Sequence, residues 1–295
     1  MTSALQRSSA KSREALVTGE FAFSVADFRA IAEIAKAEAG IDLAESKATL
    51  VYSRLAKRLR SLGLATFAEY CETVRTNEQE RGSMIAALTT NVTRFFREPH
   101  HFEHLRKNIL EPQATHIRKG GRLRLWSSAC SSGQEPYSMA LTVLSVFPDA
   151  AKLDIRILAT DLNPNVVAHG KRGLYRKEEL AEVPQGMRVK WLETVPGDPD
   201  SMRVSETARS LIAFRELNLM GNWPFKGPFD AIFCRNVAIY FDHDTQGMIW
   251  RRLSNLLVDD GALYIGHSER VSGSALKVLR TDGVTSYRKK GGARQ

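Results

Sequence analysis

The segment Asn91–Glu98, which reads NVTRFFRE, combines hydrogen-bonding side chains, two aromatic rings and two arginines. Such a segment is poorly suited to a protein core, because arginine and asparagine side chains need partners when they are buried. It precedes the first strong strand pattern of an α/β region. We therefore expect Asn91–Glu98 to contribute to a ligand site on the open edge of that region.

Two acidic residues follow predicted strands, at the sheet edge where doubly wound folds bind their ligands. Glu135 lies near a helix start after the strand Arg122–Ser127, where it could accept from an ammonium or hydroxyl group. The alternative is an ordinary acid in the first turn of a helix. Asp161 ends the strand Asp154–Thr160 and could hold both hydroxyls of a ribose, although aspartate also caps helices.

A third polar loop follows the apolar strand Pro228–Phe233 and brings Arg235, Asn236 and Tyr240 to the same edge. The alternative interpretation is a helix start with a buried tyrosine. The loop Ser127–Ser138 has one glycine and lacks the GxGxxG pattern, which disfavours a dinucleotide pyrophosphate site. A nucleoside cofactor without a pyrophosphate on such a sheet points to S-adenosylmethionine.

The sequence around these loops divides into a helical region and a region of alternating strands and helices. The first part of the chain shows helical periodicity, with Ser24 as an N-cap and Gly40 and Gly63 as stops. Helices are expected over residues 24–40, 46–62, 66–76, 78–88 and 98–116, the last interrupted at Pro112. From Arg122 onward strands alternate with helices, which is typical of a mostly parallel sheet with helices on both faces.

That alternation breaks between Val183 and Phe214. Short extended pieces at Met202–Ser205 and Leu211–Phe214 accompany a turn-rich stretch around Pro196-Gly197. The pattern predicts a small antiparallel β insertion.

Five segments in order, NVTRFFRE, ACSSGQEPYS, ATDLN, FCRNVAIYF and GHSE, resemble the CheR family, the methyltransferases of bacterial chemoreceptors. The resemblance runs from about Phe21 to Arg288 and implies an α/β fold. This fold has a doubly wound, mostly parallel sheet of the class I methyltransferase type, an N-terminal all-α domain and the small antiparallel insertion. The implied division is a disordered tail 1–19, a helical domain 20–90, a linker with the active-site motif 91–120, a methyltransferase domain 121–289 with its insertion at about 183–214, and a tail 290–295.

The resemblance also implies an activity and its residues. S-adenosylmethionine would donate a methyl group to receptor glutamate carboxylates, leaving S-adenosylhomocysteine, with no metal involved. The implied cofactor contacts are Asn91, Thr93, Arg97, Glu135, Asp161, Asn218, Leu219, Arg235 and Asn236. Arg97 and Tyr240 resemble the pair that the family places beside the methyl group and the acceptor carboxylate.

A basic helix predicts the partner. The helix over residues 46–62 carries Lys47, Arg54, Lys57, Arg58 and Arg60. The family resemblance implies that this helix meets the acidic methylation helices of chemoreceptors, whereas the alternative is a solvated helix face. Some family members also bind a receptor C-terminal pentapeptide through a glycine-rich insertion loop. The corresponding loop Glu193–Ser201 has one glycine and two prolines, which weakly disfavours that tether.

Composition limits the remaining possibilities. The 295-residue chain has a net charge of +9, which favours an acidic partner unless the basic surface is merely solvated. It has no apolar run near the ~20 residues of a membrane span, and its three cysteines form no CxxC pair. We expect a cytoplasmic monomer that meets the membrane only through its receptor and binds no nucleic acid. The alternatives are a nucleic-acid methyltransferase and a non-catalytic S-adenosylmethionine-binding signalling module.

Overall fold

The computed structural model describes residues 15–291, which form two compact units. The first contains the chain up to Thr90 together with Tyr240–Asp242, and the second contains Asn91–Ile239 and the chain from His243 onward. No helix among the described residues is long and apolar enough to cross a membrane.

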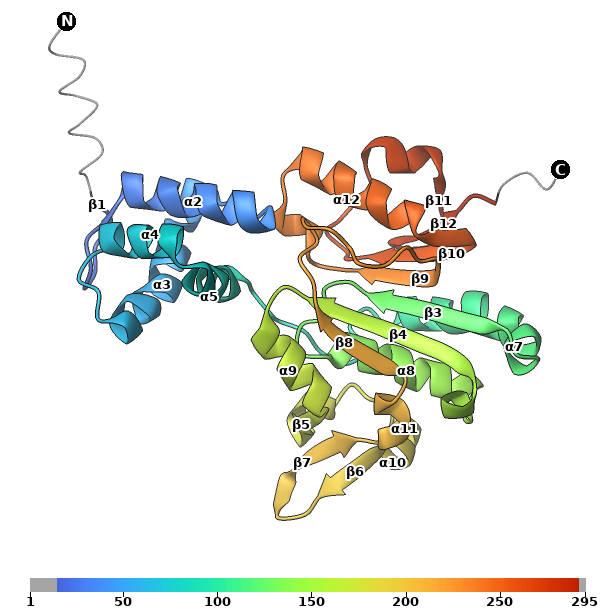
Figure 1. The fold of residues 1–295 in the computed structure, drawn as a ribbon. Helices are drawn as coiled ribbons and strands as arrows, with labels where there is room; N and C mark the ends of the chain where they lie inside the picture. Colours follow the sequence, from blue (N-terminus) through green and yellow to red (C-terminus); the bar gives the residue numbers. More distant parts are fainter. Residues whose placement is uncertain (1–14, 292–295) are drawn as a thin grey trace, which may run out of the picture. The chain divides into compact units, whose positions relative to one another are not determined.

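The first unit is predominantly helical (Figure 1). Its elements are β1 (Ala15–Val17), β2 (Phe23–Ser24), α2 (Val25–Ala39), η1 (Glu45–Lys47), α3 (Ala48–Leu62), α4 (Phe67–Thr76) and α5 (Glu78–Leu88). The Ser24 hydroxyl accepts from the backbone N–H of Asp27, and the Asp27 carboxylate accepts from the backbone N–H of Ser24, so α2 begins with a capping box. Gly40 and Gly63 end α2 and α3 in the left-handed conformation that glycine adopts without steric cost. The predicted caps are therefore confirmed.

The prediction of a disordered segment over residues 1–19 is wrong for its final part. Ala15–Val17 pairs antiparallel with Phe23–Ser24, because this apolar triplet can form a short ladder beside a buried phenylalanine. Residues 1–14 and 292–295, where both tails were predicted, lie outside the described part of the chain.

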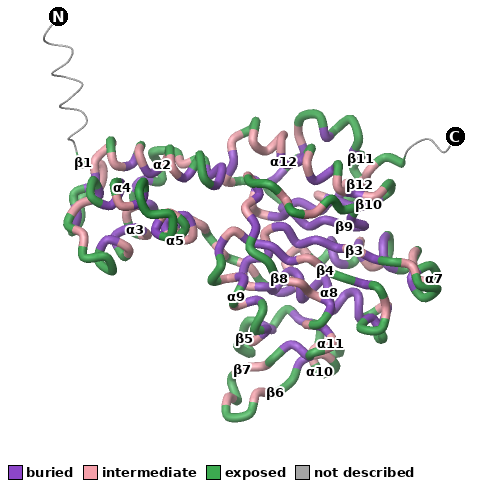
Figure 2. The backbone as a smooth tube through the Cα atoms, in the orientation of Figure 1, coloured by how far each residue is buried: buried purple, intermediate pink, exposed green. Residues whose placement is uncertain are grey.

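The second unit contains a seven-stranded sheet in the order β11-β12-β10-β9-β3-β4-β8. Its strands are β3 (Arg122–Ser127), β4 (Asp154–Asp161), β8 (Ile212–Glu216), β9 (Phe229–Cys234), β10 (Leu257–Ile265), β11 (Leu279–Thr281) and β12 (Ser286–Lys289). The five strands from β10 to β8 are parallel, and β12 is antiparallel to both β10 and β11. The central strands are buried (Figure 2), and the predicted doubly wound, mostly parallel sheet is confirmed.

Helices and short turns connect these strands. They are α6 (His100–His104), η2 (Leu105–Leu110), α7 (Glu111–Arg118), α8 (Gln134–Val146), η3 (Ala150–Lys152), α9 (Pro164–Arg172), η4 (Lys177–Leu180), α10 (Gln185–Trp191), α11 (Glu206–Arg209), η5 (Ala238–Tyr240), α12 (His243–Asn255) and η6 (Gly273–Lys277). The helix expected over residues 98–116 is irregular where η2, a π-helical segment, precedes Pro112. Proline has no N–H to donate, so a locally changed hydrogen-bond pattern is expected there.

The antiparallel insertion exists, but its predicted bounds need correction. It is a three-stranded sheet of β5 (Leu174–Arg176), β7 (Asp198–Val204) and β6 (Leu192–Val195), and it begins earlier than residue 183. The piece Leu211–Phe214 does not belong to it, because β8 pairs parallel to β4 at the edge of the main sheet. Its short length suited an insertion strand equally well, so only the pairing reveals its place.

Candidate functional site

The Asn91–Glu98 segment is an irregular loop fixed by contacts at both ends. The Arg97 guanidinium donates to the Val92 carbonyl at 3.0 Å, which folds the loop back on itself. The Phe96 backbone N–H donates to the Ser138 hydroxyl at 2.9 Å, and Phe96 has a φ of 50°. Phe95 is fully buried and packs edge-to-face on Tyr175 with ring centroids 5.0 Å apart. The loop is therefore anchored by its aromatic residues and by Arg97.

Ser131 joins two predicted site residues, Asn91 and Asp161, from distant parts of the sequence. Its backbone N–H donates to the Asp161 carboxylate at 2.8 Å, and its hydroxyl donates to the Asn91 carbonyl at 3.1 Å. The other Asp161 oxygen accepts from the Asn163 N–H at 3.0 Å. Burial raises the pKa of Asp161, and the backbone hydrogen bonds oppose this effect. The N-terminal loop, the loop after β3 and the end of β4 thus meet at one edge of the sheet.

Glu135 and Arg235 form a buried ion pair at the same edge. A nitrogen of the Arg235 guanidinium lies 3.0 Å from one Glu135 oxygen, and the Ser127 hydroxyl donates to the other at 2.7 Å. The other terminal nitrogen of Arg235 donates to the Arg97 carbonyl and lies 3.3 Å from Glu98. Burial raises the pKa of Glu135, whereas Arg235 acts in the opposite direction. Arg235 thus connects the Asn91–Glu98 loop with the start of α8.

One group of nitrogen and oxygen atoms, at the end of this loop and the start of α6, has a spacing that could suit a metal. Potential ligand atoms of Glu98, His100 and His101 lie within 4.8 Å of one another. The positive charge of Arg235, 3.3 Å from Glu98, disfavours a second cation at this position. The Glu98 carboxylate is better explained as a partner of Arg235 than as a metal ligand.

Asn218 and Leu219 follow β8 and are tied to the end of β4. The backbone N–H of Leu217 donates to the Asp161 carbonyl at 2.9 Å. The Asn218 side-chain oxygen accepts from the N–H of Met220 at 2.9 Å, and Leu219 is buried. The pair therefore lies beside Asp161 at the carboxyl ends of the parallel strands.

Asn236 adopts a left-handed conformation with φ of 58°, and Glu269 fixes the backbone around it. The Glu269 carboxylate is 4% exposed and accepts from the N–H groups of Asn236, Val237 and Ala238 at 3.0, 2.9 and 2.7 Å. It also accepts from the Gly266 N–H at 2.6 Å. Glu269 belongs to the GHSE segment, and the sequence predicted no role for it. Such a buried acid has no local sequence signature, because all of its donors except the Gly266 N–H lie about thirty residues away.

The remaining two predicted residues have fewer contacts. Thr93 is half-buried within the irregular loop. By its contacts Tyr240 belongs to the helical unit. Its carbonyl oxygen accepts from the Asp42 N–H at 2.8 Å. The pairing of Tyr240 with Arg97 therefore stays a prediction.

Comparisons with known proteins match this organisation. Residues 91–287 match the family described as CheR methyltransferase, SAM binding domain, and residues 26–89 match the CheR methyltransferase all-alpha domain. The chain belongs to the CheR methyltransferase family. It is 52% identical over 254 residues to a probable chemotaxis protein methyltransferase of Rhizobium etli, covering 85% of this chain and 95% of the relative.

Two further relatives carry similar names. The chain is 39% identical to chemotaxis protein methyltransferase 2 of Pseudomonas aeruginosa, over 91% of this chain and 94% of the relative. It is 41% identical to the chemotaxis protein methyltransferase of Escherichia coli, over 87% and 88% of the two chains. The protein is therefore an S-adenosylmethionine-dependent methyltransferase of the chemotaxis type.

The donors and acceptors at the sheet edge suit the cofactor of this family. The Asp161 oxygens accept from backbone N–H groups, and a carboxylate offers about four acceptor positions, so it keeps capacity for a ribose hydroxyl. Arg235 keeps its Nε donor without a partner among the described residues, although it is buried. S-adenosylmethionine carries both a diol, which needs acceptors, and a carboxylate, which needs donors. The residues present therefore fit the group.

The predicted partner-binding residues of α3 divide into two kinds. Arg54 donates to the carbonyls of Leu88 and Thr89 at the end of α5, and Arg58 forms a bidentate pair with the buried Glu80. Arg60 forms an exposed ion pair with Glu20 at 2.7 Å. Lys47 and Lys57 are exposed, and no partner within residues 15–291 is recorded for their ammonium groups. Arg54 and Arg58 therefore stabilise the helical unit itself, whereas the two lysines are the better candidates for an external partner.

Proposed function

We propose that this protein transfers a methyl group from S-adenosylmethionine to glutamate side chains of bacterial chemoreceptors, forming methyl esters. Membership of the CheR family supports the cofactor and the chemotaxis context. The observation that carries the proposal is the meeting of Asn91, Ser131 and Asp161 at one sheet edge, next to the Glu135–Arg235 pair.

We assign cofactor-binding roles by the chemistry of each group. Asp161 would hold the ribose hydroxyls, and Asn218 and Leu219 would contact the adenine. Asn91, Thr93, Arg97 and Asn236 would contact the rest of the cofactor, with Glu135 and Arg235 at the end opposite the adenine. When bound, the cofactor supplies a methyl group on a positively charged sulfur.

The proposed acceptor requires no general base. A glutamate side chain with an ordinary pKa of about 4.3 is ionised at neutral pH, so the nucleophile is ready. The protein then contributes mainly by holding the acceptor and the cofactor in line. We assign this role to Arg97 and Tyr240.

The role of Arg97 has a physical limit. A strong pair between its guanidinium and the acceptor carboxylate would also stabilise the ground state, which does not raise the rate. The Arg97 guanidinium already donates to the Val92 carbonyl, which shapes the loop. A mainly cofactor-orienting role for Arg97 is therefore the competing assignment.

The receptor would dock through positive charge on the helical unit. Lys47 and Lys57 are exposed on η1 and α3 and would meet the acidic methylation helices of the receptor. We also propose that the protein is a cytoplasmic monomer and that it binds no nucleic acid.

Methyl transfer from radiolabelled S-adenosylmethionine to receptor fragments, RNA and DNA, measured side by side, tests the proposal. Label should enter the receptor fragments and should not enter a fragment whose methylatable glutamates are replaced by alanine. Transfer to RNA or DNA instead would contradict it. Cofactor binding without transfer to any receptor would indicate a non-catalytic module.

A further inference from the structure

The segment from Leu217 to Pro228 joins β8 to β9 and contains no helix or strand. It begins with Leu217 and then carries Asn218 and Leu219, which the proposed function assigns to the adenine. Because such a segment lacks the internal hydrogen bonds of regular structure, its conformation depends on ties to the rest of the unit. One end is tied to β4, since the Leu217 N–H donates to the Asp161 carbonyl.

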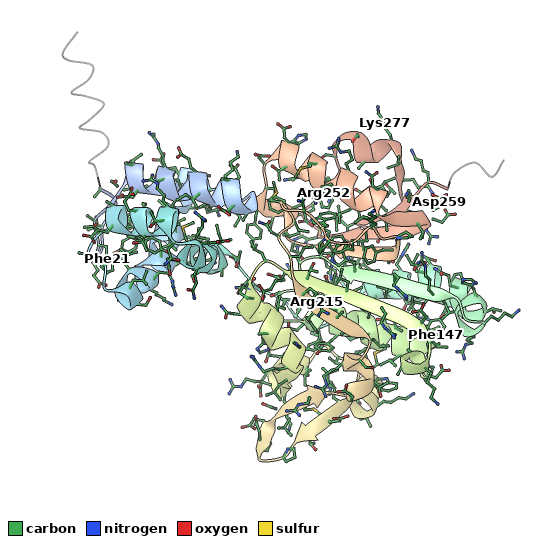
Figure 3. All side chains as sticks on the ribbon, in the orientation of Figure 1. Phe21, Phe147, Arg215, Arg252, Asp259 and Lys277 are labelled. Atoms are coloured by element: carbon green, nitrogen blue, oxygen red, sulfur yellow. The ribbon has the colours of Figure 1, made fainter. Side chains whose placement is uncertain are left out.

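Arg252, which lies on α12 (Figure 3), makes a second set of contacts with this segment. Its two terminal nitrogens donate to the carbonyls of Leu219 and Gly221, each at 2.7 Å. Its guanidinium carbon Cζ lies over the Trp223 ring, 3.8 Å from the ring centroid. A single side chain thus makes three contacts with one loop.

Trp223 in turn connects Arg252 to the sheet through aromatic contacts. Trp223 packs edge-to-face on Trp126 with ring centroids 5.0 Å apart, and Trp126 is fully buried in β3. The Trp126 ring N–H donates to the Thr160 hydroxyl at 2.9 Å, and Thr160 directly precedes Asp161. Arg252 therefore positions the loop against the same strand end that carries the proposed ribose-binding carboxylate.

The chemistry of these contacts requires arginine. A guanidinium offers forked donors in one plane together with a flat face that stacks on an indole ring. An ammonium group on a lysine is a compact point charge and cannot supply that geometry. The neighbouring Arg251 is exposed, and no side-chain contact is recorded for it within the described chain.

We propose that Arg252 is a positioning residue that sets the adenine-binding wall formed by Asn218 and Leu219. It acts through the carbonyls of Leu219 and Gly221 and does not itself contact the cofactor. This inference rests on the proposed function, because that function assigns the adenine to this loop. Its consequence is that Arg252 determines affinity for the nucleoside end of the cofactor and leaves the methyl-transfer step itself unchanged.

The test compares Arg252→Lys with the matched control Arg251→Lys on the full chain. Calorimetry should show the Kd of S-adenosylhomocysteine rising about tenfold in Arg252→Lys, which corresponds to roughly 1.4 kcal/mol. The control should bind like the parent protein. The parent should also prefer S-adenosylhomocysteine over S-inosylhomocysteine, and this preference should shrink in Arg252→Lys. At saturating cofactor kcat should change by less than about twofold, since the adenine contact is weakened equally in the ground state and the transition state.

A purely structural role would give a different result. Arg252→Lys would then lower the melting temperature while the folded protein kept the parent Kd and the parent base preference, and that result overturns the inference. Arg252→Gln serves as a second variant, and failure of both variants to fold also overturns it. If the parent binds S-adenosylhomocysteine and Arg252 variants lose this binding while no receptor is methylated, the proposed acceptor fails but the inference stands.

Discussion

A guanidinium nitrogen of Arg235 lies 3.0 Å from the carboxylate of Glu135, and both side chains are almost completely buried. This pair joins the end of β9 to the start of α8. The same arginine donates to the Arg97 carbonyl, so the loop with the candidate catalytic arginine is held by the pair. The pair therefore shapes the site as well as stabilising the unit.

Arg235→Leu should be strongly destabilising. Removing one partner leaves the Glu135 carboxylate buried without its cation, which costs roughly 3–5 kcal/mol of unfolding free energy. The exposed pair of Arg75 with Glu72 supplies the control, since Arg75→Leu should cost at most about 1 kcal/mol. Urea unfolding monitored by circular dichroism measures both. Equal small losses for the two variants would show that the buried pair is not a stabilising contact.

His101 should make the protein sensitive to acid. Its side chain is fully buried, and burial together with Arg235 lowers its pKa from 6.5 to about 3. The unfolded chain therefore binds a proton between these pH values while the folded chain does not. This contribution to stability is complete above about pH 6.5 and is lost as the pH falls toward 3. The loss of unfolding free energy reaches about 2 kcal/mol at pH 5.

The comparison with His101→Phe measures that contribution. The difference in unfolding free energy between pH 7.5 and pH 5 should be about 2 kcal/mol smaller in His101→Phe than in the parent. His243 is exposed, so His243→Phe should keep the parent pH dependence. An unchanged pH dependence in His101→Phe would mean that His101 is not kept neutral by the fold.

Glu269→Gln should disturb the loop that carries Asn236. The amide of glutamine replaces one acceptor oxygen with an N–H₂ group that faces backbone donors. Hydrogen bonds to a charged group contribute about 1.5–3 kcal/mol each, so a loss of about 2–4 kcal/mol in unfolding free energy is expected. Methyl transfer should fall with it, whereas the exposed Glu193→Gln should change neither. Parent-like stability in Glu269→Gln would exclude this role for its charge.

The helix α3 provides a test that separates docking from folding. Lys57→Glu should weaken receptor methylation and reduce its salt dependence, with little effect on stability, because the Lys57 ammonium is exposed. Arg58→Glu should instead unfold the helical unit, because it places a second acid against the buried Glu80. Methylation rates from 50 to 300 mM salt report on receptor docking, and melting temperatures report on folding, so together they distinguish the two effects. Unaltered methylation in Lys57→Glu would place the receptor contact elsewhere.

Arg97→Ala should lower kcat on the order of 100-fold, since loss of alignment alone can have an effect of this size. The melting temperature should stay near that of the parent, because Arg97 is only half-buried and makes one side-chain hydrogen bond. Single-turnover kinetics and the Kd of S-adenosylhomocysteine separate the two assignments. A large rise in Kd with a normal rate at saturation would make Arg97 a cofactor-binding residue only.

Local patterns predicted the elements of this protein well, and tertiary contacts account for the rest. Ser24, Gly40 and Gly63 act where their side-chain chemistry or backbone freedom demands it, so their caps were readable from sequence. The strand that ends at Asp161 could also be predicted, because its apolar residues follow one another locally in the sequence. The place of β8 depended on its pairing with β4.

Individual side chains of the site were less predictable. The basic residues of α3 looked alike in sequence, yet Arg58 turns toward a buried acid 22 positions away. Glu269 and Arg252 act on backbone groups about thirty positions distant, and no local pattern records such contacts. The sequence thus indicates which loops meet at the sheet edge, whereas the structure shows which side chains hold those loops.

The central claim is that the product is a glutamate methyl ester. Receptor-containing membranes labelled with the tritiated methyl group of S-adenosylmethionine and then treated with mild base test it most directly. Esters hydrolyse under these conditions, so the label should be released as volatile methanol, and Arg97→Ala should release far less. Label that resists base, as a methylamine would, contradicts the account.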